Sequence, residues 1–160
     1  MVQTLLAERF QLRVHLETKQ LPGYSLVVAK NGPRLKESVR DDCPSPAGTC
    51  GGVYNFGGGI SPREVGERAS MAQLAQELST VLGRTVQDNT GLAGLYDFTL
   101  AWRPDENQPG VGGGRVPYAG DANAPSLFEA VQDQLRLKLE ANRVPVEILV
   151  IDHVEMPSEN

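Results

Sequence analysis

The sequence contains few of the side chains that carry metal and acid–base chemistry. Its 160 residues include two cysteines and two histidines, His15 and His153, which lie far apart along the chain. Two cysteines with no histidine near them are too few ligands for a structural zinc site, which has four. The motifs G-x-S-x-G and H-E-x-x-H are both missing. We therefore expect no cofactor and no metal site, and the catalytic residues, if any, remain unknown.

Two classes of partner are also excluded by what is missing. The chain has 15 basic and 20 acidic residues, for a net charge of −5, whereas a protein that binds the nucleic-acid backbone needs clustered lysine and arginine. No apolar run approaches the roughly 20 residues that a membrane-spanning helix requires. No basic-then-apolar leader opens the chain, so we expect no signal peptide in this sequence.

Hydrophobic residues are plentiful, and they follow two different periods. They make up 40% of the chain, enough for one packed domain. Segments with apolar residues at helical spacing are followed by segments in which apolar and polar residues alternate, as in half-buried strands. We predict a single α+β domain over residues 1–160, with helices packed on a mixed or antiparallel sheet.

A helix–strand–strand order occurs three times, at about residues 4–32, 70–103 and 125–155. The joints between helix and first strand align as FQLRV, LGRTV and LRLKL, and the second strands align as YSLVVAK, YDFTLAW and VEILVID. A helix with one hairpin cannot bury its apolar face alone, but several such units can share a sheet. We therefore predict three related helix–strand–strand units.

Two of the predicted helices have clear N-terminal signals. Ser70 with Gln73, and Ser126 with Glu129, have the spacing of a capping box, in which each side chain bonds a free backbone N–H. The first helix is predicted from about Thr4, where an apolar stripe begins.

Turns are predicted inside the first and third units, at Leu21-Pro22-Gly23 and at residues 141–145. Residues 146–151 are apolar on both faces apart from Glu147, so we predict a central strand that is covered on both sides. Residues 40–69 and 103–125 are rich in glycine and proline, and we predict irregular loops there, longer than usual connections.

Three aromatic residues, Tyr54, Phe56 and Tyr118, lie in glycine-rich stretches. These stretches lack the spacing of a phosphate-binding loop and are expected to form loops or a bulged hairpin. Aromatic side chains in such segments offer contact area at low entropic cost, which favours a ligand- or partner-binding surface. The alternative is that they fold back over the sheet, and the sequence leaves both open.

The two cysteines, Cys43 and Cys50, are separated by six turn-forming residues. This spacing permits a small disulfide loop, which is typical of an oxidising compartment. The alternative is two free thiols on the surface. We predict the disulfide.

The histidines are predicted to be surface residues. Asp152 and His153 are adjacent, and neighbouring residues of a strand point to opposite faces, so they are not expected to act as a pair. His15 alternates outward from the first strand. We predict no activity that depends on either histidine.

Three blocks of the chain, LLAERFQLRVHLETKQLPGYSLVVAKNGPRLK, SMAQLAQELSTVLGRTVQDNTGLAGLYDFTLAW and PSLFEAVQDQLRLKLEANRVPVEILVIDHVEMPSEN, resemble in order a family of soil-bacterial proteins of unknown function, numerous in Acidobacteria. Members usually carry an export signal and further residues upstream, so the resemblance implies a periplasmic or extracytoplasmic location. It implies no activity and no catalytic residues. In pattern alone, the chain also resembles the small modules at the periplasmic ends of secretins and TonB-dependent receptors, which assemble and bind partners.

From these features we predict a non-catalytic binding or assembly module of the cell envelope, with a protein or small-molecule ligand. The alternative is a small hydrolase that acts on an ester, lactone or glycoside, with its site in the glycine-rich loops. An enzyme requires converging titratable groups in a cleft, whereas a binding module requires an open strand edge or an exposed apolar patch. The sequence fixes neither the ligand nor the oligomeric state.

Overall fold

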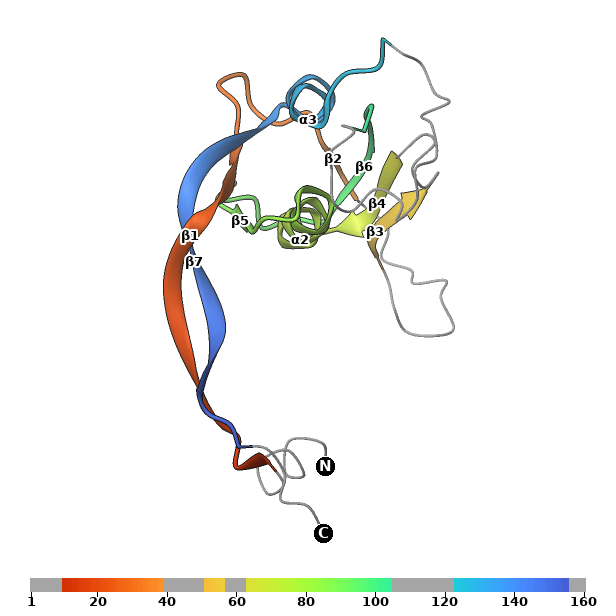
Figure 1. Ribbon diagram of the computed structural model, residues 1–160. Helices are drawn as coiled ribbons and strands as arrows, with labels where there is room; N and C mark the ends of the chain where they lie inside the picture. The colour runs from red at the N-terminus through yellow and green to blue at the C-terminus, as the bar shows by residue number, and fades with distance from the viewer. Residues whose placement is uncertain (1–9, 39–50, 57–62, 105–122, 156–160) are drawn as a thin grey trace, which may run out of the picture. The chain divides into compact units, whose positions relative to one another are not determined.

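The computed structural model describes residues 10–38, 51–56, 63–104 and 123–155. The chain divides into two compact units: unit 1 contains Met1–Leu21 and Pro145–Asn160, and unit 2 contains Pro22–Val144. The described residues form two helices and two sheets, which confirms the α+β class (Figure 1).

The first sheet has the strand order β5-β1-β7 and the second has the order β2-β6-β4-β3. The elements in chain order are β1 (Arg13–Val28), β2 (Lys36–Glu37), β3 (Gly52–Phe56), β4 (Arg63–Ala69), α2 (Met71–Leu82), β5 (Val86–Asp88), β6 (Tyr96–Ala101), α3 (Leu127–Leu135) and β7 (Leu137–His153).

β1 and β7 are long neighbouring strands that run in opposite directions (Figure 1). In unit 2, the Asn142 side chain bonds Ser25, and the N–H of Ala29 donates to the carbonyl of Arg136. Later residues of β1 thus contact earlier residues of β7, as in an antiparallel pair. β5 pairs in parallel with β1, with Tyr24 opposite Val86. The first sheet is therefore mixed, while the second is antiparallel throughout.

The predicted capping boxes are present in both helices. The Ser70 hydroxyl accepts from the N–H of Gln73, whose side chain accepts in turn from the N–H of Ser70, and Ser126 with Glu129 repeats this arrangement at α3. The inner faces of the two helices are buried, as the apolar stripes predict, and they contribute Met71, Leu74, Ala75, Leu78, Val81, Leu127, Ala130, Val131 and Leu135 to the core.

The three aligned helix-to-strand joints share one backbone feature. Gln11, Gly83 and Arg136 each have a left-handed conformation, with φ of 47°, 61° and 54°, and each follows a helical residue. A left-handed residue ends a helix because its N–H turns back to the last carbonyl groups, as Gly83 and Arg136 do here. The helix predicted from Thr4 lies outside the described residues, apart from its end at Phe10.

The predicted pairing within each unit is wrong. The turns predicted inside the first and third units are absent, because β1 runs unbroken through Leu21-Pro22-Gly23 and β7 runs unbroken through residues 141–145. In the second unit, β5 and β6 belong to different sheets. Helix, left-handed residue and strand follow one another at α2–β5 and at α3–β7, without a hairpin after either helix.

Gly23 explains why the Pro-Gly pair was misleading. A Cβ on this residue would lie 2.5 Å from the carbonyl oxygen of Thr85 and from a methyl group of Val144. Glycine in a strand interior often marks such a close approach of another chain segment, not a turn. Extended backbone also tolerates Pro22, since proline requires only that its missing N–H is not needed.

Two further predictions were wrong. Residues 40–69 are not irregular throughout, because β3 and β4 form an antiparallel pair from Gly52 opposite Glu67 to Phe56 opposite Arg63. Residues 146–151 are not a covered central strand: β7 lies at an edge of its sheet, and Leu149 and Ile151 are exposed. These apolar residues lie on a surface, and residue types alone do not distinguish an apolar surface from a core.

The core of unit 2 lies between the helices and both sheets. Leu26 and Leu137 of the first sheet and Leu100 of the second are fully buried in the same cluster as the helix residues. Ser25 is a buried polar residue on β1, and its hydroxyl accepts hydrogen bonds from the amides of Asn89 and Asn142.

Candidate functional site

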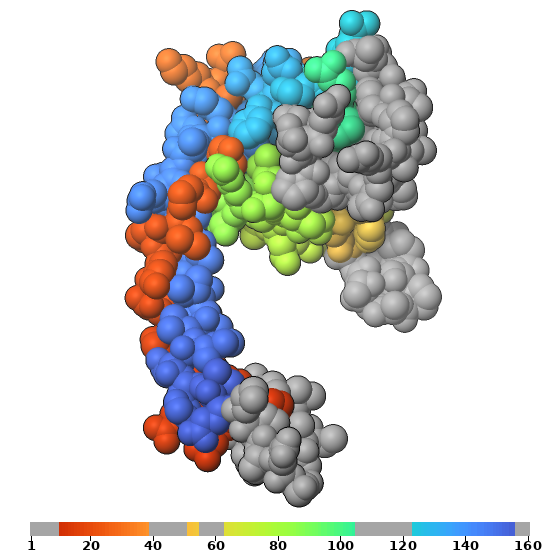
Figure 2. Space-filling model, in the orientation of Figure 1, coloured from red at the N-terminus to blue at the C-terminus, as the bar shows by residue number. Residues whose placement is uncertain are grey.

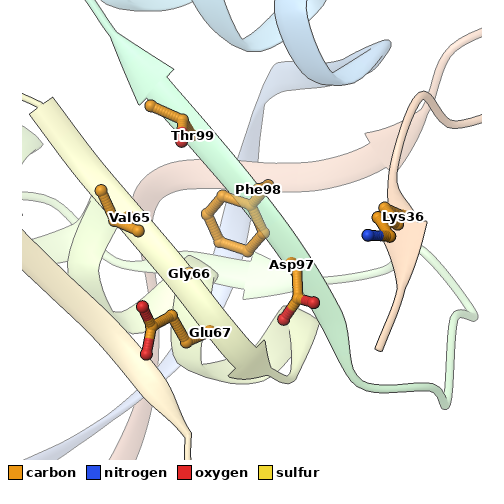
Figure 3. Close-up of a pocket in the computed structure, with 7 residues that line it drawn as sticks. All are labelled: Lys36, Val65, Gly66, Glu67, Asp97, Phe98 and Thr99. Carbon is orange, nitrogen blue, oxygen red and sulfur yellow. The ribbon is translucent and has the colours of Figure 1, made fainter. Parts of the chain in front are cut away.

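The described part of unit 2 has an open cavity of about 330 Å³ on the second sheet. Figure 3 shows Lys36 on β2 beside Asp97 on β6, with Glu67 on the neighbouring strand β4. The remaining lining residues are Val65, Gly66, Phe98 and Thr99. The cavity is thus bordered by one cation and two carboxylates.

Asp97 has a structural task at this cavity. The pairing of β4 with β6 shifts between Gly66 and Ala69, as in a β-bulge. Within the bulge Arg68 adopts a left-handed conformation, with φ of 48°, and its N–H donates to Asp97 Oδ1 at 3.0 Å. The bulge therefore occupies one oxygen of this carboxylate.

The floor of the cavity is formed by a glycine–aromatic pair. Gly66 lies opposite Phe98 in the register, and the Phe98 ring covers the glycine so closely that a Cβ there would collide with it. An aromatic ring over a cross-strand glycine shields the exposed backbone and pins the register. The cavity lies over this glycine–aromatic pair, beside the bulge.

Buried polar groups occur on the core face of the same sheet. The Glu64 side chain is fully buried opposite Leu100, and Trp102 is 2% exposed with no hydrogen-bond partner for its Nε1 among the described residues. Alternation along β6 predicts the burial of Trp102, whereas nothing in the sequence around Glu64 marks it as a buried carboxylate.

The residues predicted to bind a ligand or partner are not brought together within the described chain. Tyr54 lies on β3 and is 42% exposed. Phe56 ends the same strand, but its side chain is not described, and Tyr118 lies outside the described residues. Cys43 and Cys50 also lie outside them, so the disulfide stays a prediction. No group of three or more metal-binding side chains occurs within residues 10–38, 51–56, 63–104 and 123–155.

Unit 1 presents a second candidate surface. Its described part consists of β1 up to Leu21 and β7 from Pro145, which form a two-stranded ribbon. On the face that Figure 2 shows, side chains of both strands lie at the surface, β1 in red to orange and β7 in blue. Within this ribbon the exposed large apolar residues are Val14, Leu16, Leu21, Leu149 and Ile151, at 42%, 61%, 39%, 61% and 60%.

Four of these residues, Val14, Leu16, Leu149 and Ile151, share one face of the ribbon. His15 Nδ1 and Asp152 Oδ2 lie 2.8 Å apart, so these two side chains are on the same face. Because successive strand residues alternate between faces, Val14 and Leu16 lie on the opposite face, together with Leu149 and Ile151. We call this surface the apolar ribbon face.

The histidines form hydrogen bonds that the sequence did not predict. Asp152 bonds His15 on the other strand, while the adjacent His153 bonds Glu155 through Nε2 at 2.9 Å. Asp152 and His153 therefore contact different partners. Both histidines are exposed, as expected, and no serine or cysteine is among the partners described for either.

The pKa of one carboxyl group departs from its ordinary value for a structural reason. The Ser126 backbone N–H and hydroxyl bond the Glu129 carboxylate at the start of α3 and lower the pKa of Glu129. Glu129 is therefore a helix-capping residue. None of the described helices is long and apolar enough to cross a membrane.

Comparison with known proteins assigns a family without an activity. No curated protein and no solved structure matches the chain. The family model described as "Protein of unknown function (DUF3738)" matches residues 1–154. Since this match covers nearly the entire sequence, both units and both candidate surfaces are part of the family's common region, and the chain belongs to the DUF3738 family of proteins of unknown function.

Proposed function

We propose that the chain is a non-catalytic binding or assembly module of the cell envelope and that the apolar ribbon face is its binding surface. The observation that carries the proposal is the exposure of Val14, Leu16, Leu149 and Ile151 on one face of a two-stranded ribbon. Exposed apolar patches on folded proteins mark interaction sites.

The architecture of the ribbon supports the same proposal. A two-stranded ribbon is marginally stable in water, and three or more strands or a packed layer are needed for independent stability. Within the described residues of unit 1, β1 and β7 have only each other as strand neighbours. A partner that adds a strand or covers the apolar face would therefore stabilise the ribbon as it binds.

The envelope location rests on the resemblance to exported soil-bacterial proteins and on the pattern shared with the end modules of secretins and TonB-dependent receptors. A disulfide between Cys43 and Cys50 would agree with an oxidising compartment. The alternative, a hydrolase with its site in the glycine-rich loops, concerns mainly residues that the structure does not describe.

Binding to an immobilised synthetic strand of alternating valine and threonine tests the proposal. The wild-type chain is compared with the double variant Leu149→Lys/Ile151→Lys by surface plasmon resonance. Burial of each side chain contributes about 1.5–3 kcal/mol, so we expect the double variant to bind at least about tenfold more weakly.

The matched control is Leu95→Lys, which places a charge on an exposed leucine of unit 2. It should bind as the wild type does. If the wild-type chain does not bind the strand, or if all three proteins bind it equally, the apolar ribbon face is not the binding surface.

A further inference from the structure

The two outer edges of the ribbon differ in how well they are protected against strand pairing. Along β1, residues 13–19 include Arg13, Glu17 and Lys19, and the last two form an ion pair of 3.3 Å. Charged side chains, lysine above all, discourage another strand from pairing at an edge. Residues 146–151 of β7 read VEILVI and contain one charge. Such a segment, apolar and free of proline, is a template for strand addition.

The edge of β7 is open over this segment. In the sheet order β5-β1-β7 the strand has one neighbour, β1, and no other described strand pairs with it. Pro145 has no N–H to offer a ladder, so a partner strand could pair continuously only with the residues after it. The open segment is therefore residues 146–153.

We propose that this segment pairs antiparallel with the same segment of a second copy, across a two-fold axis at Val150. The inference rests on the proposed function, because it names the partner of the same ribbon. A two-fold axis normal to the sheet keeps equivalent faces on one side, so only residues of equal parity stand opposite each other.

The pairing of Glu147 selects the register centred on Val150, since Asp152 stands opposite an apolar residue in this register and in both neighbouring ones. It places Glu147 opposite His153 of the second copy, and Leu149 opposite its Ile151. Moving the centre to Leu149 would place Glu147 against Ile151, and moving it to Ile151 would place Glu147 against Glu155. Cross-strand pairs of opposite charge or of apolar side chains stabilise a sheet, whereas like charges opposite each other destabilise it. The His153 ring meets Glu155 through Nε2, which leaves Nδ1 for the second copy.

The resulting four-stranded sheet would join the two apolar ribbon faces into one. Leu149 and Ile151 of each copy become adjacent at the centre, with Val14 and Leu16 of each copy beside them on β1. The pairing thus supplies the additional strands that a ribbon needs for stability, and it satisfies backbone groups along the open edge.

A charge-swap series tests the pairing on the full chain. The dimer dissociation constant is measured by analytical ultracentrifugation for the wild type, Glu147→Lys, His153→Glu and the double variant. Each single variant should weaken the dimer about tenfold, because each dimer contains the cross-strand pair twice. The double variant places a lysine opposite a glutamate and should recover most of the loss. Glu140→Lys, an exposed change on β7 outside the open segment, should leave the dimer unchanged.

The outcomes separate this inference from the proposed function. A chain that stays monomeric at high micromolar concentration but still binds the valine–threonine strand through Leu149 and Ile151 overturns the second-copy inference alone. A dimer dissociation constant that does not change in the single variants also overturns the second-copy inference. The same holds if the double variant does not recover the wild-type value. Loss of both dimerisation and strand binding removes the proposed function as well.

Discussion

The same two strands are buried in unit 2 and exposed in unit 1. Leu26 of β1 and Leu137 of β7 are fully buried in unit 2, whereas Leu16 and Leu149 of the same strands are each 61% exposed in unit 1. In unit 2 both strands pack in one cluster with α2 and α3. Alternation of apolar residues gives a strand a face to bury, but a second layer must be present to bury it.

The largest expected effect on stability comes from truncating one leucine in each unit and comparing the two variants. Leu74→Ala removes a fully buried side chain from α2, and the loss of contacts together with the cavity should cost about 2–5 kcal/mol. Leu149→Ala removes an exposed side chain and should change the unfolding free energy by less than about 0.5 kcal/mol. Both values come from urea denaturation at low micromolar concentration, where a dimer contributes least. Equal effects would mean that the ribbon is as well packed as the core.

A second test compares two positions on β1, one in each unit. Gly23→Ala would force a Cβ against the Thr85 carbonyl and Val144 in unit 2, at an expected cost of about 1–3 kcal/mol. Thr18→Ala, on the exposed part of the strand, is the control and should change stability by less than about 0.5 kcal/mol. Thermal unfolding monitored by circular dichroism measures both. If Gly23→Ala left the thermal stability unchanged, this glycine would not be required for close packing.

The smallest expected effect concerns unit 2 alone and compares the pH dependence of its two capping boxes. The box at α3 uses Glu129, whose pKa the hydrogen bonds from Ser126 lower from 4.5, while the box at α2 uses the uncharged Gln73. A carboxyl group whose pKa is lowered by folding stabilises the fold above its unfolded pKa, and this stabilisation is lost as the pH falls through the folded value. The Tm difference between the wild type and Glu129→Gln should therefore shrink below about pH 4.5.

Gln73→Glu provides the complementary change for this pH series. It should introduce a similar loss at low pH into α2, because a carboxylate then accepts from Ser70. A Tm difference between wild type and Glu129→Gln that stays constant from pH 6 to pH 2.5 would contradict the assignment of Glu129 as a charged cap.

Local signals in the sequence predicted the helices well and the sheets poorly. Ser70 and Ser126 act within a few residues, so the capping patterns are visible in a short window. Gly23 is fixed by Thr85, which is 62 positions away along the chain, and only the folded chain brings the two together. The sequence therefore indicated a turn at the point where two segments pack closely.

The candidate surface was also only partly predictable. Alternation places Val14 and Leu16 on one face of β1, but residues 146–151 are apolar on both faces, so the shared face with Leu149 and Ile151 follows only from the contact between β1 and β7. The absence of a covering layer among the described residues is not visible in the sequence either. Tyr54 is 42% exposed on β3, where the sequence had left open whether it faces a partner or folds back over the sheet, and its binding role stays a prediction. The pairing of His15 with Asp152 could not be predicted, since it depends on which two strands become neighbours.

One side chain on α3 makes the pair of hydrogen bonds that a neighbouring strand would make. Gln134 receives the N–H of Ala101 on its amide oxygen at 3.0 Å and donates its amide nitrogen to the Ala101 carbonyl at 2.7 Å, so one side-chain amide bonds both backbone groups of a residue in β6. This arrangement requires that the side-chain amide has an acceptor oxygen and a donor nitrogen. Deamidation of Gln134 to glutamate would replace the donor by an oxygen facing a carbonyl oxygen and would break one of the two bonds. Spontaneous chemical ageing at a single surface residue would thereby loosen the join between α3 and the second sheet.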